Sequence, residues 1–285
     1  MIEAIALGER IIAYVINNVW AERTLYVVMA ISILMAFAYD VYRGRDLRAR
    51  YLSAGVRTDI IYGVIVMSHI QAMLIVGPFT AIVLDITSSP WFRFDQMTAI
   101  PFWLQLLLAF AYRDCFAYWY HRAQHANAWL WQTHKVHHSV EHMTVLSTFR
   151  FTLVDLLVEA MIFVPIAGVS GSLELPFALY VLNLFRSSLQ HSDTGWTFGP
   201  IGWLIVSPAF HETHHSTALE HRDKNFSVMF SVWDHLFGTY SPREKAQLTY
   251  GLVGDRIPES FFVQLFVPLA GYWRLARGFR RSVQA

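Results

Sequence analysis

Long apolar runs recur through the first two thirds of the chain, each followed by a more polar stretch. A helix needs about 20 mainly apolar residues to cross a bilayer. The runs that approach this length are Leu25–Tyr42, Ile60–Ile86, Met97–Tyr120, Phe151–Gly168 and Leu173–Leu189. The last two flank the turn-like residues Val169–Ser172 and predict a helical hairpin, while the shorter Ile11–Trp20 is expected at the membrane interface. We therefore expect an all-α membrane protein with about four transmembrane helices.

The polar part of the chain predicts a cap on these spans. Residues 191–258 contain little span-like sequence and are expected to form a cytosolic helical cap. Glu259–Arg281 mixes phenylalanines with arginines, which favours an amphipathic interfacial helix ending in a basic patch, with an ordinary cap helix as the alternative. We expect a single integral membrane domain over residues 1–285, with its histidine-bearing core at about residues 100–240.

The composition agrees with a membrane location. Hydrophobic residues make up 55% of the chain and charged residues 15%, against about 45–50% and about 25% in soluble domains. The net charge of +1 gives no reason to expect a nucleic-acid partner. The single cysteine, Cys115, excludes an internal disulfide, a thiolate zinc site and a cysteine-ligated iron–sulfur cluster. The first ten residues carry two glutamates and lack a basic segment, so no secretory signal peptide is expected.

Basic residues predict which face of the membrane carries the cap. Five arginines crowd the connection between the first two runs, namely Arg43, Arg45, Arg48, Arg50 and Arg57. Loops rich in arginine and lysine stay in the cytosol. With this loop inside, the third run ends at His121 on the cytosolic side, and the hairpin returns His191 to the same side. All histidine clusters are then expected at the cytosolic face.

The histidines provide the candidate chemistry. The chain has 13, and all except His69 lie between residues 121 and 235. Three clusters have helical spacings, so each could project two or three imidazoles in one direction. With His191 after the hairpin, they provide nine candidate metal ligands: His121, His125, His134, His137, His138, His191, His211, His214 and His215. Nine imidazoles exceed the needs of one tetrahedral zinc and suit two metals with open positions, such as irons that activate dioxygen.

These segments resemble a known family. Asp114–His125 (DCFAYWYHRAQH) and His134–Ser139 (HKVHHS) are similar to the first two histidine boxes of the fatty acid hydroxylase/sterol desaturase superfamily. The similarity continues through Gln190–Asp193, Ser207-Pro208, His211–Ser216, Asn225-Phe226 and Trp233–Tyr240. The resemblance implies an integral membrane di-iron enzyme that uses O2 and external electrons to hydroxylate or desaturate a lipid. A related branch cleaves ether lipids. It also implies that the nine histidines above are the ligands, with zinc as a possible substitute for iron.

Two departures from the family pattern leave the substrate open. Some fatty acid hydroxylases have a histidine pair near His191, whereas Ser187 stands four residues before it here. Many members resemble Arg-x-His-Pro after the second box, and this chain reads Arg150-Phe-Thr-Leu153. Sterol, fatty acyl, sphingoid, carotenoid and ether lipids all remain possible substrates.

Polar residues near the clusters are candidates for holding the ligand imidazoles. Asp114, Asn225 and Asp234 lie inside the resembling motifs, and Asp155 with Glu159 could either bind imidazole N–H groups or pair with Arg150. The remaining histidines have weaker patterns. His142 is expected to be exposed, His69 to be a hydrogen-bonded core residue, and His221 and His235 to lie off the metals.

Two other functions compete with the oxygenase. His211–His215 also matches the H-E-x-x-H motif of zinc proteases, with Glu212 as general base and Glu220 as a possible third ligand. That interpretation leaves the other clusters without a use. A metal-binding or transport protein is the third possibility, although transporters place such ligands at mid-membrane. A Glu212→Gln variant would separate protease from oxygenase.

An oxygenase would need a separate electron donor. The chain has no dinucleotide-binding fingerprint, no cysteine set and no fused haem domain, so a cytochrome or ferredoxin is expected at the cytosolic face. Lys135, Arg222 and Lys224 could attract an acidic donor, although ordinary solvated charges are the simpler interpretation.

Overall fold

The computed structural model is an assembly of helices. It describes residues 19–68, 99–170, 174–243 and 248–278, and all statements below concern these residues. The longer helices are α2 (Val19–Tyr42), α4 (Ala54–Met67), α6 (Phe102–Ala126), α7 (Ala128–His138), α8 (Leu153–Ser170), α9 (Glu174–Gln190) and α12 (Phe261–Ala276). Short helices are α3 (Leu47–Tyr51), η4 (Val145–Phe149), η5 (Gly199–Trp203), α10 (Pro208–His214), η6 (Leu219–His221) and α11 (Val232–Phe237). The described part of the chain has two isolated β-bridges and no strand.

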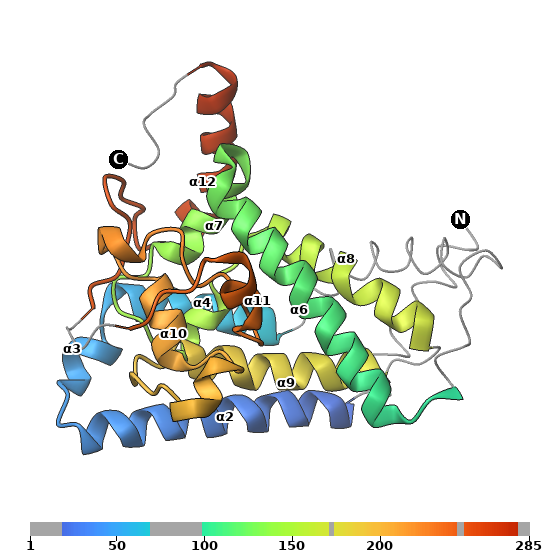
Figure 1. The fold of residues 1–285 in the computed structure, drawn as a ribbon. Coiled ribbons are helices and arrows are strands. Elements are labelled where there is room, and N and C mark those ends of the chain that lie inside the picture. The colour runs from blue at the N-terminus through green and yellow to red at the C-terminus, as the bar shows by residue number, and fades with distance from the viewer. Residues whose placement is uncertain (1–18, 69–98, 171–173, 244–247, 279–285) are drawn as a thin grey trace, which may run out of the picture.

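The long helices lie against one another at one side of the molecule. Helix α2 packs along α9, and α9 also contacts α6 and α8. Figure 1 shows α2 and α9 running side by side, while α7, α10 and α11 are drawn above them and to the left of α8. Helix α12 packs on α7 and rises crosswise to α2 in the same view.

The predicted apolar runs largely correspond to helices. Arg23–Tyr42 in α2 is the one described helix that is long and apolar enough to cross a membrane. The hairpin prediction is met by α8 and α9, which contact each other. The third run lies mainly in α6, which continues past His121 to Ala126. Helix α4 covers the beginning of the second run, and the rest of that run, like most of Ile11–Trp20 and all of His69, lies outside the described residues.

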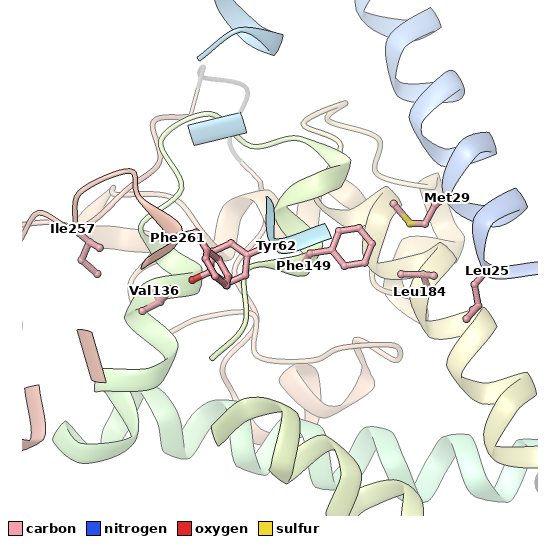
Figure 2. Close-up of a cluster of buried hydrophobic side chains, with 8 residues drawn as sticks. All are labelled: Leu25, Met29, Tyr62, Val136, Phe149, Leu184, Ile257 and Phe261. Atoms are coloured by element: carbon pink, nitrogen blue, oxygen red, sulfur yellow. The ribbon is translucent and has the colours of Figure 1, made fainter. Parts of the chain in front are cut away.

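One apolar cluster joins elements that are distant in sequence. Figure 2 shows it reaching from Leu25 and Met29 on α2, through Phe149, to Ile257 and Phe261 at the start of α12. These side chains are buried, so their removal from water stabilises the packing that connects α2, through Phe149 of η4, with the segment that leads into α12. The bundle and the polar segments therefore share one core.

Local capping sets where α7 and α10 begin, and these two helices carry five of the nine candidate ligands. Asn127 ends α6 and starts α7, and its side-chain oxygen accepts from the N–H groups of Trp129 and Leu130. This cap permits a sharp turn between the two helices. Ser207 caps α10 in the same way, with Pro208 at the first helical position. The caps thus define the first residues of α7 and α10, and so the positions from which their histidines project.

Candidate metal centre

The nine predicted histidines gather in two adjacent groups. His121, His125, His134, His138 and His214 form the first group, and His137, His191, His211 and His215 form the second. Within each group the candidate ligand nitrogens all lie within 4.8 Å of one another. Eight of the nine residues are buried, and the side chain of the ninth, His125, is only 7% exposed. Each group could therefore hold one metal ion.

Two helices contribute to both groups. On α7, His134 and His138 face the first group and His137 the second; on α10, His211 faces the second group and His214 the first. The helical spacing by itself predicts that the members of each cluster project in one direction. The division follows from helix geometry. Each residue is rotated by about 100° about the helix axis from the one before it, so the residues three and four positions after a given histidine lie on opposite sides of it.

The nitrogens within each group are spaced like ligands of a common ion. The Nε2 atoms of His137 and His191 are 3.2 Å apart, and that of His211 lies 3.0 Å from that of His191. In the first group, Nε2 of His138 lies 3.1 Å from Nε2 of His134 and 3.0 Å from Nε2 of His214. Two nitrogens at right angles, each about 2.1 Å from one ion, would be about 3.0 Å apart. The donor set therefore fits a metal in each group.

Backbone carbonyls fix which ring nitrogen faces the group. Nδ1 of His121 donates to the oxygen of Phe226 at 2.8 Å, Nδ1 of His191 to that of Ser187 at 2.7 Å, and Nδ1 of His214 to that of Lys224 at 2.8 Å. A neutral imidazole has one N–H, so in each ring Nε2 carries a lone pair. Nε2 of His121 is buried without a hydrogen-bond partner. A cation would satisfy these converging lone pairs.

Burial keeps the imidazoles neutral. Desolvation lowers the pKa of His121 and the pKa of His191 to about 4. It also lowers the pKa of each of the other seven rings well below 6.5, and neighbouring histidines lower it further. Neutral imidazole is the form that binds metals. At neutral pH the rings are thus already in the ligand form.

Two further contacts with the ligand rings were not expected from the sequence. Oδ1 of Asp223 lies 3.4 Å from Nδ1 of His125, in the place of a carboxylate that orients a metal-bound histidine. Phe151 stacks on His137, with ring centroids 5.5 Å apart and planes 7° apart. Asp223 is the last residue of His221–Arg222–Asp223, which follows the third cluster. Its backbone has a left-handed φ of 54°, and the sequence of this segment does not predict that angle.

Asp114 and Asp234, two of the three motif residues, act on the site through backbone groups. Asp234 accepts from the N–H groups of Phe226 and Ser227, and so fixes the carbonyl that holds His121. Asp114 accepts from the N–H groups of Met229 and Phe230 and from the indole of Trp233. From the sequence we expect direct bonds between these carboxylates and imidazole N–H groups. The chain segment 226–230 passes between these carboxylates and the histidines, so backbone amides take the oxygens instead.

Asn225 fixes the same segment from its other end. Its side-chain amide donates to the carbonyl oxygens of Phe210 and Ser241, and its side-chain oxygen accepts from the N–H of Ser241. The residue has a left-handed φ of 60°, which asparagine tolerates better than most residues. Asn225 therefore ties α10 to the segment after α11.

Asp155 joins α6 to α7 beneath the first group. Its Oδ1 accepts from Gln124 at 2.8 Å and from Thr133 at 3.3 Å, each of which is next to a histidine of this group. The sequence offered two roles for Asp155 and Glu159, which were to bind imidazole N–H groups or to pair with Arg150. The structure shows neither, and Glu159 pairs with Arg113. Arg150 binds Asp59 and Glu259 instead, because α4 and the start of α12 approach it.

The other histidines in the described residues lie outside the two groups. His142 is exposed, as expected. His235 stacks between Trp203 and Tyr240, with ring centroids 5.0 Å and 4.1 Å away. His221 is buried, and neither of its ring nitrogens has a hydrogen-bond partner among the described residues.

A cavity of about 570 Å³ adjoins the histidine groups. Its walls come from α7, residues 214–218, residues 222–223, residues 251–255 and the last turns of α12. Four ligand candidates line it: His125, His138, His214 and His215. The cavity is in the size range of small-molecule sites, about 300–1,000 Å³, so a substrate group could reach both groups from it.

These observations define a protein with two buried, all-histidine groups, each of which could hold a metal ion. Residues 106–239 match the family model described as fatty acid hydroxylase. The sequence resemblance is confirmed, since the segment that carries the nine histidines matches the fatty acid hydroxylase family. No solved structure matches the chain.

Curated relatives are named for lipid oxidation. An ornithine lipid hydroxylase (OlsE) of Rhizobium tropici is 27% identical over 172 residues, which are 60% of this chain and 52% of the relative. An alkylglycerol monooxygenase of Xenopus tropicalis is 28% identical over 238 residues, 80% of this chain and 48% of the relative. A cholesterol 25-hydroxylase of Mus musculus is 31% identical over 129 residues, 42% of this chain and 41% of the relative. The chain thus spans about half the length of these relatives or less.

Proposed function

We propose that this chain is a membrane-bound non-haem di-iron oxygenase that hydroxylates or desaturates a lipid, and that residues 1–285 act as a single domain. In hydroxylation, one C–H bond becomes C–OH with one atom of O2. The other oxygen atom leaves as water, which takes up two protons and two electrons from a donor. Two irons would supply the O2 chemistry that side chains lack.

The arrangement of the nine histidines carries this proposal. His121, His125, His134, His138 and His214 would hold one iron, and His137, His191, His211 and His215 the other. Five and four nitrogen ligands leave open positions for O2 and substrate. All-nitrogen ligation suits iron, although zinc readily occupies such sites. The histidine-rich motifs and the names of the relatives support lipid oxidation.

We propose that the chain crosses the membrane about four times and carries its metals at the cytosolic face. The apolar helix Arg23–Tyr42 supports one span, and the apolar runs in α4, α6, α8 and α9 support the others. The arginine-rich connection after α2 supports the orientation. Lipid would then reach the site from the bilayer.

We propose that a separate cytochrome or ferredoxin supplies the electrons. Of the basic residues considered for its docking, Lys135 is buried and lies 3.3 Å from Asp255, so it is poorly placed to attract a large partner. Arg222 and Lys224 are half-buried and stay as candidates for this contact.

The geometry of Glu212 favours the oxygenase over the zinc protease. In a protease with this motif, the glutamate acts on a water bound to the metal. Here the two oxygens of Glu212 accept from the N–H of Gly195 at 2.9 Å and from Arg243 at 2.5 Å. The carboxylate is buried and engaged away from the histidines of its own helix, and the protease would leave seven of the nine unused.

Metal content tests this function. Detergent-purified protein analysed by elemental mass spectrometry should contain about two metals per chain. Oxygen uptake with a chemical reductant and a panel of lipids should then identify a substrate by its hydroxylated product. About one zinc per chain that is lost with His211→Ala or His215→Ala, but is indifferent to His121→Ala and His137→Ala, would point to a protease instead.

A further inference from the structure

Charged side chains of both signs line the cavity beside the histidine groups. Lys135, Arg222 and Arg274 supply positive charge, and Asp223 and Asp255 supply negative charge. The Nζ atom of Lys135 lies 3.3 Å from Oδ2 of Asp255. An alkyl chain placed here would remove these groups from water without binding them, which is unfavourable. A ligand group that itself carries both charges could pair with both walls.

The cavity also adjoins a helix suited to the membrane surface. The side of α12 turned away from α7 exposes large apolar residues, namely Phe262, Val263, Phe266, Leu269 and Trp273. Buried Gly271, by contrast, lies against Gln132 of α7. The guanidinium of Arg277 lies 3.6 Å from the ring centroid of Trp273. Because α12 runs crosswise to α2 (Figure 1), it would lie along the bilayer surface if α2 spans the membrane.

Lipid headgroups occupy that same surface layer. The last turns of α12 contribute Arg274 and Leu275 to the cavity wall. A headgroup that moves from the bilayer along α12 would therefore meet charged walls first and the histidines next. The apolar tail would stay against the exposed side of α12 and the membrane.

We propose that this cavity holds the zwitterionic headgroup of a membrane lipid. The oxidised carbon then belongs to the headgroup or to the first atoms of the attached chain, rather than to the far end of an acyl tail. This inference rests on the proposed function, because it takes the two histidine groups as the reacting centre. It narrows the substrate to lipids that carry both a cationic and an anionic group.

Binding of matched lipids tests the headgroup preference without turnover. Four decanoyl lipids would be titrated calorimetrically into the full chain in detergent. Their heads would be an amino acid with free amine and carboxylate, phosphocholine, uncharged glycerol, and a carboxylate alone. We expect at least one zwitterionic lipid to bind about tenfold more tightly than the glycerol and carboxylate lipids. Equal affinities for all four would overturn the proposal, and the first two titrations distinguish the two kinds of zwitterion.

Variants of single charged residues test whether the preference for a zwitterionic lipid arises in this cavity. Arg274→Gln and Asp255→Asn should each reduce the preference for the zwitterionic lipid about fivefold or more. The controls Arg277→Gln, at the residue that follows α12, and Glu220→Gln, an exposed acid of η6, should leave it unchanged. All four positions are exposed, so circular dichroism should show an intact fold. A preference that survives both cavity variants would place the headgroup elsewhere.

The position of the new oxygen tests the second half of the inference. Fragmentation of the product in a mass spectrometer should place the oxygen on the headgroup or on the adjoining carbons. Oxygen at the far end of the tail would overturn this part. Selective binding by a metal-loaded chain that consumes no oxygen would instead refute the proposed function while leaving the headgroup site in place.

Discussion

The ring of His121 and the carboxylate of Asp234 are connected through a single residue of backbone. His121 donates to the carbonyl oxygen of Phe226 at 2.8 Å, and the N–H of Phe226 donates to Oδ1 of Asp234 at 2.8 Å. The other oxygen of Asp234 accepts from Ser227 at 2.7 Å. The orientation of this imidazole therefore depends on a carboxylate that does not touch it.

Asp234→Asn should weaken metal binding in the first histidine group. An amide cannot accept from Phe226 and Ser227 with both of its ends, so the carbonyl that holds His121 would lose its support. Loss of such an indirect partner costs about 10–100-fold in metal affinity. Metal titration should show one weakened site and one unchanged site. Asp46→Asn is the matched control, because the asparagine oxygen can still cap α3 and the residue lies outside both histidine groups; an equal loss at both sites would contradict the selective role.

Single histidine variants should separate the two metals. His214→Ala should lower the metal content from about two to about one per chain by emptying the first group, and His137→Ala should do the same to the second. Both should abolish lipid turnover, because the proposed reaction needs both metals. Elemental analysis of each purified variant gives the answer. His235→Ala is the control, since its ring packs between Trp203 and Tyr240, and a loss of metal there would show that the groups are wrongly drawn.

Glu212→Gln should preserve both metals and much of the oxygenase activity. The amide keeps the bond from Gly195 but loses the ion pair with Arg243, so stability should fall by about 1–3 kcal/mol. Thermal unfolding and oxygen uptake, measured on one preparation, separate the two effects. Complete loss of activity at full metal content would show that this carboxylate takes part in the reaction.

Arg150→Met should be among the most destabilising single changes. Its guanidinium is fully buried and bonds Asp59 at 2.6–2.7 Å and Glu259 at 3.1 Å. Removing it leaves the buried carboxylate of Asp59 without its cation, at a cost of about 3–5 kcal/mol. The double variant with Asp59→Asn should recover part of that loss, as measured by thermal unfolding in detergent. No recovery would mean that Glu259 is the partner that matters.

Removal of the metals should lower the thermal stability of the protein. A ligand that binds only the folded state adds about 2.7 kcal/mol when present at a hundred times its dissociation constant. Dialysis against a chelator should therefore lower the melting temperature, and added iron or zinc should restore it. The Arg150→Met variant should have a lower melting temperature, but chelation should lower that temperature by the same amount as in the unaltered protein. A melting temperature unaffected by chelation would speak against metal binding in the buried groups.

Much of the site was predictable because its signals are local. The spacings of His121 with His125, and of His211 with His215, follow from one helical turn, so the sequence identified them as pairs on a common face. The long apolar runs likewise predicted most of the longer helices, since a helix needs about 20 apolar residues to cross a bilayer and such a run can be recognised in the sequence. His191 was identified by the family resemblance and by its place at the end of the hairpin, where α9 brings it into the second group.

The sequence alone determined the helical character of this protein, its nine candidate ligands and the resemblance of its histidine-bearing segment to the fatty acid hydroxylase family. Only the tertiary structure decided how α7 and α10 divide their histidines between two groups, and which carbonyls and carboxylates hold them. It also decided that α12 closes a charged cavity against residues more than a hundred positions earlier in the chain. The reason is physical: helical spacing is fixed within a few residues, whereas the partner of a buried polar group depends on which distant segment packs against it.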